Sequence, residues 1–255
     1  MSELKAVKAS EFPLKSSLFW SNNGQVESTW GLLKKNATDA WINRLIQWHT
    51  EQSLNTAVFL TYNRDPNCFV TPFVQTYGPN VDWVEVTRWM KLFKLGQQGS
   101  NLIPCLFSDD DSETANNIAF HNYYVPGACV ALGPFSRAIC IGLEMNERFS
   151  LAAMEHIIEL CHTYTDKPVV VHMQWNTITR LPRGLDGLIY EHPWQPDKGP
   201  THSADEVASI GAQVIARAGI PVGFNEYTLW PWEEHGRNQT RALAKLPCWL
   251  IGGPL

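Results

Sequence analysis

Short apolar runs alternate along this chain with amphipathic segments of helical length. Most of the runs are rich in β-branched residues and stay hydrophobic for several residues in succession, which is typical of strands buried on both faces of a parallel sheet. Eight runs fit this description and are predicted to be strands: residues 17–22, 56–63, 101–107, 138–147, 168–176, 185–193, 220–227 and 247–253.

The segments between the runs predict helices. Apolar residues recur at helical spacing within residues 29–50 and 81–94. Ser150 is placed to cap a helix that follows it. Ser203 opens a capping-box sequence before an apolar-periodic stretch that stops at Gly219, where a C-terminal cap glycine is expected. Strands and helices therefore alternate throughout.

Eight strands with interleaved helices in 255 residues match the size and strand count of a (β/α)₈ TIM barrel, an α/β fold. No break in composition divides the chain, so we predict a single domain over residues 1–255, with residues 1–16 as an N-terminal extension. The chain ends soon after the last predicted strand, so the usual closing C-terminal helix is expected to be missing. Either the N-terminal segment or a second copy of the chain, in a homo-oligomer, would then cover the open side.

Charge and hydropathy narrow the classes of partner. The chain has 20 Lys and Arg against 25 Asp and Glu, a net charge of -5, so it offers no basic field for nucleic acid. No N-terminal stretch has the pattern of a signal peptide, and no run approaches the roughly 20 apolar residues of a membrane span. We expect a soluble protein that binds neither nucleic acid nor membrane, in the cytoplasm or released from the cell.

Cofactors and metals gain little support from sequence motifs. Neither a G-x-G-x-x-G nor a P-loop sequence occurs, and H-E-x-x-H is absent. The cysteines lack metal-ligand spacing, and several lie in apolar runs, so free buried thiols are expected. They are Cys68, Cys105, Cys129, Cys140, Cys161 and Cys248. We predict no cofactor and no metal.

The active site of a (β/α)₈ barrel forms at the carboxyl ends of its strands. The residues expected there in this chain are polar and aromatic. Aromatic rings stack on the C–H face of a sugar, so this set suits a carbohydrate cleft, although large hydrophobic loops under a lid give a similar set. The candidate substrate-binding residues are Trp20, Asn63, Asp109, His172, Trp175, Tyr190, His192, Trp194, Tyr227 and Trp230.

Two carboxylates end predicted strands and are preceded by asparagine. These are Glu147 after Asn146 and Glu226 after Asn225. Strands four and seven of an eight-stranded ring lie nearly opposite each other, so the two carboxyl groups can face each other across a small gap. Glycoside hydrolysis needs such a pair, because one carboxyl protonates the leaving oxygen while the other attacks the anomeric carbon.

The sequences GLEMNE and GFNEY, which contain these pairs, resemble the clan A glycoside hydrolases. Those retaining (β/α)₈ enzymes, such as cellulases and mannanases, carry an Asn-Glu acid/base at the end of strand four and a nucleophilic Glu at the end of strand seven. The resemblance implies Glu147 as acid/base and Glu226 as nucleophile. It also implies that the Asn146 amide hydrogen-bonds the sugar 2-hydroxyl.

Some features depart from the clan pattern or leave a choice. Arg148 stands where the clan often has proline. On a regular strand Asn146 and Glu147 point to opposite faces, which makes Glu144 the inward carboxylate unless the strand ends or bulges there. The candidates for the residue that hydrogen-bonds the nucleophile are, in order, Tyr190, Tyr227 and His192.

The sequence therefore predicts a glycoside hydrolase that cleaves a β-linked glycan by a retaining double displacement. Its partner would be an oligo- or polysaccharide substrate. Two alternatives stay open. One is a carbohydrate-binding or structural barrel without turnover. The other is a metal-dependent hydrolase whose ligands would come from His172, His192, His202, Asp109 and Glu191.

Overall fold

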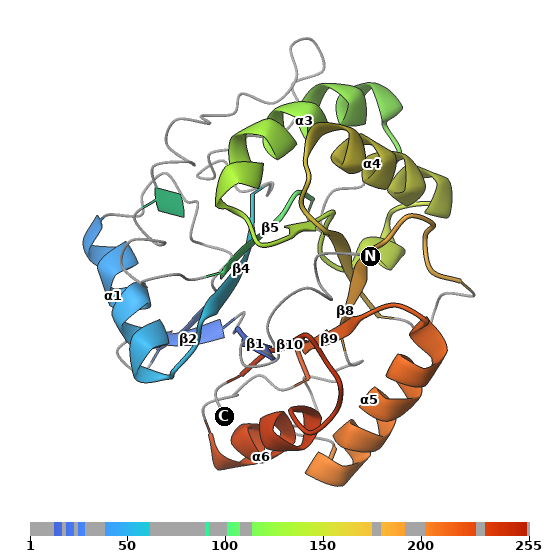
Figure 1. Cartoon of the computed structure of the whole chain (residues 1–255). Coiled ribbons are helices and arrows are strands. Elements are labelled where there is room, and N and C mark those ends of the chain that lie inside the picture. Colours follow the sequence, from blue (N-terminus) through green and yellow to red (C-terminus); the bar gives the residue numbers. More distant parts are fainter. Residues whose placement is uncertain are drawn as a thin grey trace.

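The computed structural model of the chain has parallel strands around a common centre, with helices outside them (Figure 1). It describes residues 13–16, 19–22, 25–28, 39–61, 90–91, 101–107, 114–174, 180–191, 202–227 and 233–253. The parallel strands are β1 (Leu14–Lys15), β4 (Thr56–Leu60), β5 (Asn101–Cys105), β6 (Ile139–Cys140), β7 (Val169–Met173), β8 (Gly187–Glu191), β9 (Val222–Asn225) and β10 (Leu250–Ile251). They pair in the order β1-β10-β9-β8-β7-β6-β5-β4. The predicted (β/α)₈ fold class is confirmed.

The two edges of this sheet meet, which makes the barrel nearly closed. The main-chain N–H of Asn55 donates to the carbonyl of Lys15 at 3.0 Å. The main-chain N–H of Lys15 donates in return to Oδ1 of Asn55 at 2.8 Å. The start of β4 is thereby tied to β1.

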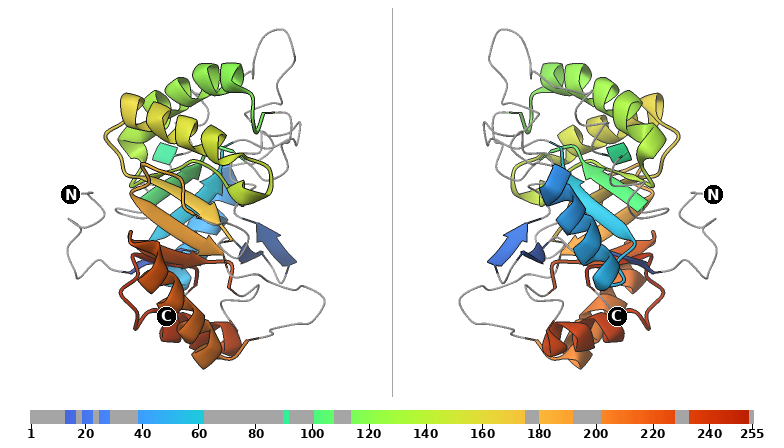
Figure 2. Two further views of the ribbon diagram at one scale, coloured as in Figure 1. Left: turned by 90° about the vertical axis from the view of Figure 1, so that its right-hand side faces the viewer. Right: turned by 90° about the vertical axis from the view of Figure 1, so that its left-hand side faces the viewer.

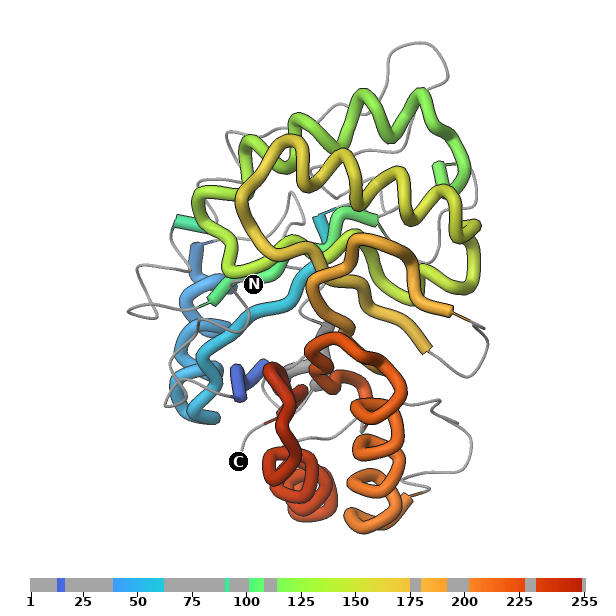
Figure 3. Tube along the Cα trace, turned by 45° about the vertical axis from the view of Figure 1, so that its right-hand side comes forward, coloured from blue at the N-terminus to red at the C-terminus, as the bar shows by residue number. Residues whose placement is uncertain are grey.

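Helices cover the outside of the barrel. They are α1 (Asp39–Glu51), α3 (Ile118–Leu132), α4 (Leu151–Tyr164), α5 (Ala204–Ala218) and α6 (Glu234–Leu243). Figure 3 shows α3 beside α4, α5 beside α6, and β1 against β10. None of these helices, in the part of the chain that the structure describes, has the length and apolar character needed to cross a bilayer.

Several helix boundaries follow from capping, as predicted. Ser150 accepts a hydrogen bond from the N–H of Ala153 and so caps α4. The capping box of Ser203 and Glu206 is formed at the start of α5, and Gly219 ends that helix with φ 69°. Of the helix predicted over residues 29–50, α1 covers the part from Asp39 onward. Residues 29–38 and most of 81–94 lie outside the described residues, although 90–91 are helical.

Side chains of the barrel strands alternate between two apolar clusters. One cluster joins strands from all round the ring and so fills the barrel interior; it includes Val58, Ile103, Val170, Ile189 and Leu250. The other packs the strands against the helices and includes Phe59, Leu102, Val171, Leu188 and Phe224. Because successive strand residues face opposite sides, His172 shares the inner face of β7 with Val170, and Glu191 shares that of β8 with Ile189.

The prediction for the first strand is wrong. The barrel strand is β1 at Leu14–Lys15, inside the segment assigned to an N-terminal extension. The run predicted as the first strand instead forms β2 (Phe19–Asn22), which pairs antiparallel with β3 (Gln25–Ser28). Only Asn23 and Gly24 connect these strands, and Asn-Gly is the dipeptide that two-residue hairpin connections favour. Figure 2 shows this hairpin at the end of the barrel toward which the parallel strands point.

The prediction of free buried thiols is confirmed for the described cysteines. All of these are buried and free: Cys105, Cys129, Cys140, Cys161 and Cys248. Cys68 lies outside the described residues.

Candidate active site

Glu226 lies at the carboxyl end of β9, in a backbone conformation that residues other than glycine rarely adopt. Its φ is 53°, in the left-handed region, which is strained for a residue with a Cβ by about 1 kcal/mol or more. The buried side chain of Asn225 holds this turn, because its Oδ1 accepts the main-chain N–H of Glu226 at 3.1 Å. The Glu226 side chain keeps 14% of its surface exposed. A carboxylate is thus fixed at the barrel mouth and reachable by a ligand.

Gly252 explains how Asn225 is held. A Cβ added at Gly252 would overlap Oδ1 of Asn225 and would lie 3.0 Å from its Cα. Only glycine allows the chain after β10 to approach Asn225 this closely. The glycine pair that follows β10 therefore has a packing role beside Glu226.

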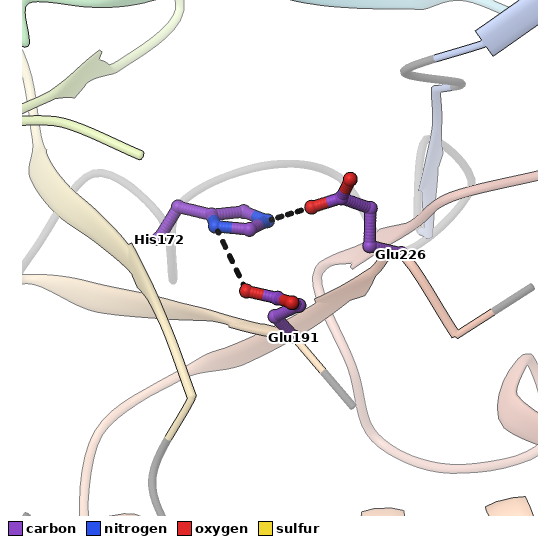
Figure 4. Close-up of side chains that lie close together, drawn as sticks. All are labelled: His172, Glu191 and Glu226. Atoms are coloured by element: carbon purple, nitrogen blue, oxygen red, sulfur yellow. Dashed lines mark ion pairs between the residues drawn. The ribbon is translucent and has the colours of Figure 1, made fainter. Parts of the chain in front are cut away.

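His172 lies between two carboxyl groups (Figure 4). It comes from the inner face of β7 and is fully buried. Its Nε2 is 3.5 Å from Oε2 of Glu226, and its Nδ1 is 4.0 Å from Oε2 of Glu191. In Figure 4 the Glu226 carboxyl lies off the Nε2 edge of the ring, and the Glu191 carboxyl lies below the ring. These three side chains, from β7, β8 and the end of β9, form the centre of the site.

Burial decides the charge of two of these groups. It lowers the pKa of the His172 imidazole to about 3, so the ring is neutral at ordinary pH. Two causes raise the pKa of the Glu191 carboxyl to about 8: burial, which is the larger, and the negative charge of Glu226. A hydrogen bond of 2.9 Å from Nε2 of Gln174 to Oε1 of Glu191 opposes this rise. At neutral pH Glu191 is therefore protonated.

The raised pKa of Glu191 predicts how stability depends on pH. Its folded value of about 8 lies above the ordinary 4.5, so the folded state holds a proton that the unfolded chain loses first. The contribution of Glu191 to stability is therefore most favourable below about pH 4.5 and becomes less favourable as the pH rises to about 8. Glu191→Gln removes this penalty and keeps an oxygen for Gln174. We expect it to raise the free energy of unfolding by about 1–3 kcal/mol at pH 8 and little at pH 5.

Urea denaturation at the two pH values measures this effect. Glu159→Gln is the matched control, since Glu159 is exposed on α4 and its substitution should change neither value. If the Glu191→Gln variant is only as stable as wild type at both pH values, the claim that Glu191 is protonated in the folded protein is wrong.

The segment after β6 differs from its prediction. The strand was expected to run to Glu147, but β6 ends at Cys140, and Met145–Glu147 forms a 3₁₀ turn, η5. A Cβ on Gly142 would overlap the side chain of Met145, so the chain folds back over this glycine. Met145 is buried by the fold-back, which is what ends the strand. The condition under which Asn146 and Glu147 can both lie at the mouth is therefore met.

The two residues of the Asn-Glu pair differ in their surroundings. Oδ1 of Asn146 accepts the main-chain N–H of Gln174 at 3.1 Å, which ties the turn to the end of β7. Glu147 is exposed. Its negative charge also contributes to the raised pKa of Glu191, so it lies on the same side of the barrel as the buried cluster.

Glu144, the alternative inward carboxylate, contacts the cluster directly. Its main-chain N–H donates to Nδ1 of His172 at 3.5 Å. Its carboxyl shares a hydrogen bond with the Glu191 carboxyl. Like Glu226, it has a positive φ, 45°. Glu144 and Glu147 thus both remain candidates for the second carboxylate.

Two predicted mouth residues face the helices instead. The Tyr190 ring packs edge-on against Phe224, with centroids 6.3 Å apart, in the outer cluster. The Tyr227 hydroxyl hydrogen-bonds Oγ1 of Thr240 on α6 at 2.7 Å. Strand alternation is the reason on β8, where Glu191 takes the inner face and Tyr190 the outer. The contacts described above for the two tyrosines thus lie on the helix side of the barrel, and applying that alternation to the sequence could have singled out Glu191.

Other predicted site residues have no described side chain. Trp20 belongs to β2, whose hairpin lies at the mouth end of the barrel (Figure 2). The rest lie outside the described residues: Asn63, Asp109, Trp175, His192, Trp194 and Trp230.

A metal could be considered at the central cluster. One ligand atom each from His172, Glu191 and Glu226 lie within 4.8 Å of one another. However, the two carboxyl groups lie near different nitrogens of the His172 ring: Glu226 is near Nε2 and Glu191 is near Nδ1. An ion bound to one ring nitrogen would therefore be close to only one of the two carboxyl groups. The carbonyl of His202, another predicted ligand residue, accepts a hydrogen bond from Gln239.

Several solved structures with a similar barrel are glycoside hydrolases. The endo-1,4-β-mannanase from Rhizomucor miehei aligns with a TM-score of 0.62 and 12% identity over 93% of this chain and 89% of that chain. The GH113 β-mannanase from Alicyclobacillus acidocaldarius gives 0.56 and 13%, covering 94% and 85%. The β-glucosidase from Pyrococcus furiosus gives 0.54 and 8%, covering 94% and 85%. The chain has the fold of these enzymes.

The comparisons by sequence find no match. No family model and no curated protein matches the chain. Identities of 8–13% establish the fold alone, so the activity has to be argued from the side chains of the site.

Proposed function

We propose that this protein is a retaining glycosidase that cleaves a β-linked glycan. The observation that carries the proposal is the setting of Glu226. It is a partly exposed carboxylate at the carboxyl end of the seventh barrel strand, in strained backbone, beside a neutral buried imidazole and a protonated carboxyl. Strain of this kind persists where the surrounding structure enforces it, and it concentrates at active sites.

In the proposed reaction the Glu226 carboxylate attacks the anomeric carbon while the bond to the leaving oxygen breaks. Glu147 gives its proton to that oxygen, and a glycosyl-enzyme forms on Glu226. Glu147 then takes a proton from water as the water attacks the anomeric carbon and releases Glu226. Asn146, anchored on Gln174, is the residue we assign to the sugar 2-hydroxyl.

Glu191 would support this chemistry without touching the sugar. It is only 4% exposed, so it cannot reach a glycosidic oxygen as the acid must. Because it is protonated at neutral pH, it adds no second negative charge beside Glu226. The nucleophile can then stay ionised without repulsion from its nearest carboxyl neighbour.

β-Mannan is the substrate we place first, because several proteins with this fold are β-mannanases. The test is a reducing-sugar assay of the wild-type protein on β-mannans, β-glucans, xylans and chitosan, with and without a chelator. We expect chelator-resistant release from one of these glycans. Binding without release would support a carbohydrate-binding barrel, and release abolished by the chelator would support a metal-dependent hydrolase.

Gly252→Ala is expected to impair catalysis through Asn225. The added methyl group must displace the Asn225 side chain, whose Oδ1 holds the main chain of Glu226. A small misplacement of a catalytic group can lower the rate by about 10- to 100-fold. We expect a loss of that order in kcat, measured on the glycan that the panel identifies.

Gly219→Ala is the matched control for this substitution. Gly219 caps α5 with a positive φ and has open space around its Cα, so alanine there strains the helix end alone. It should lower the free energy of unfolding by about 1 kcal/mol and leave kcat unchanged. Equal kcat for Gly252→Ala and wild type would contradict the role given to Asn225.

A further inference from the structure

We propose that His172 is a positioning residue for Glu226, held by the main-chain N–H of Glu144 in the tautomer that carries its proton on Nε2. In this arrangement Nε2–H points at Oε2 of Glu226 and orients the carboxylate in its charged form. The catalytic consequence rests on the proposed function, whereas the tautomer itself does not.

The Nδ1 side of the ring decides the tautomer. The main-chain N–H of Glu144 reaches Nδ1 at 3.5 Å. A main-chain N–H can only donate, so Nδ1 must accept and cannot carry a proton of its own. The Glu191 carboxyl is 4.0 Å from Nδ1, which is too far for a hydrogen bond to compete.

The ring must also be neutral for this argument to hold. His172 is fully buried, with charged neighbours on several elements, and burial lowers its pKa to about 3. A neutral imidazole has one N–H. With Nδ1 accepting from Glu144, that N–H is on Nε2.

The Nε2 side of the ring faces Glu226. Nε2 lies 3.5 Å from Oε2 of Glu226 and, among the described residues, has no hydrogen-bond partner. A buried donor without a partner is destabilising, so a small movement that shortens this contact is favoured. Hydrogen bonds in active sites are often long without substrate and tighten when it binds.

Backbone strain flanks the ring on both sides. Glu144 contacts Nδ1 and Glu226 faces Nε2, and both have positive φ values, 45° and 53°. Among the described residues, Ser53 is the other residue with a side chain and a positive φ. Strain on both contacts of one imidazole fits a ring whose orientation the fold enforces.

Two variants of His172 distinguish the loss of the hydrogen-bond donor from a change in side-chain size. His172→Gln keeps an N–H near the position of Nε2, and His172→Leu removes it with a side chain of similar size. A donor to a carboxylate favours its charged form, so its loss raises the pKa that governs the acid limb of kcat/KM. For His172→Leu we expect kcat about 10- to 100-fold lower, KM little changed, and the acid limb about one unit higher.

The comparison of the two variants isolates the effect of the hydrogen-bond donor from the effects of neighbouring charged groups. The described titratable groups around His172 and Glu226 stay the same in both variants: Glu144, Glu147, Glu191 and Cys105. His172→Gln should therefore keep the wild-type acid limb and most of kcat. Identical acid limbs in the Leu and Gln variants would overturn the positioning role.

Nitrogen NMR of the histidine-labelled wild-type protein tests the tautomer without any substrate. The chain has eight histidines, and the signals missing from His172→Gln identify those of residue 172. We expect a protonated Nε2 and an unprotonated Nδ1, unchanged from pH 8 down to about pH 5. A protonated Nδ1, or titration near pH 6.5, would overturn the inference.

The same spectra distinguish the remaining outcomes. If Zn²⁺ added at one equivalent displaces the Nε2 proton, Nε2 is a metal ligand rather than a donor to Glu226, and the inference fails. If the tautomer is as expected but no glycan is cleaved, the proposed function fails and the assigned tautomer stands. Because wild-type protein is used, poor folding of His172→Leu does not affect this test.

Discussion

Replacing Glu226 with glutamine is expected to lower kcat on the order of 10⁴-fold or more, the scale on which loss of a covalent nucleophile acts. Glutamine has nearly the same shape, and Asn225 can still hold the main chain at this position. The protein should therefore stay folded. Removing the negative charge also removes one cause of the raised pKa of Glu191.

The measurement is kcat on the glycan found by the panel, with the melting temperature as the check on folding. A 2-deoxy-2-fluoroglycoside with a good leaving group should label the wild-type peptide that contains Glu226, because the second step of a retaining mechanism is slowed. Glu159→Gln, on the exposed face of α4, is the control and should keep wild-type kcat. Retention of activity by Glu226→Gln, or labelling of another carboxylate, would remove Glu226 from the mechanism.

Glu147→Gln is expected to lower kcat on a natural glycan by about 10²- to 10⁴-fold, the range for loss of a general acid. The leaving oxygen of a glycan needs a proton, whereas an aryl leaving group of low pKa does not. Glycosyl-enzyme formation from an activated aryl glycoside should therefore be nearly unaffected. Azide, which needs no general base, should restore turnover of that substrate and give a glycosyl azide of retained configuration.

Glu144→Gln decides between the two candidate acids. Glutamine at 144 keeps the main-chain N–H that contacts His172, so the substitution tests the carboxyl alone. If Glu147 is the acid, Glu144→Gln has the smaller effect and shows no azide rescue. The reverse pattern, with rescue in Glu144→Gln, would assign the role to Glu144 instead.

Local sequence signals predicted much of the framework. The alternation of apolar runs and helical segments gave the parallel barrel, because strands covered on both faces must be apolar throughout. Capping predicted where α4 and α5 begin, since Ser150 and Ser203 satisfy the first main-chain N–H groups through their own side chains. The Asn-Glu sequence before Tyr227 also placed Glu226 correctly at the end of β9.

The errors came where a short apolar run had more than one partner available. The run containing Trp20 pairs with β3 through an Asn-Gly connection rather than with the barrel, which left Leu14–Lys15 to form β1. The run before Glu147 stops at Cys140 because Met145 folds back over Gly142. Neither choice can be read from apolar periodicity, since both depend on contacts made elsewhere in the fold.

What the sequence by itself determined is the (β/α)₈ barrel, the buried thiols and the position of Glu226 after β9, because these follow from local pattern and strand order. Only the tertiary structure decided that His172 lies against Glu226 and that the Glu191 carboxyl lies on the other side of the same ring. It also decided the charges at the site. Those charges arise from burial and from neighbours on other strands, which no stretch of sequence contains.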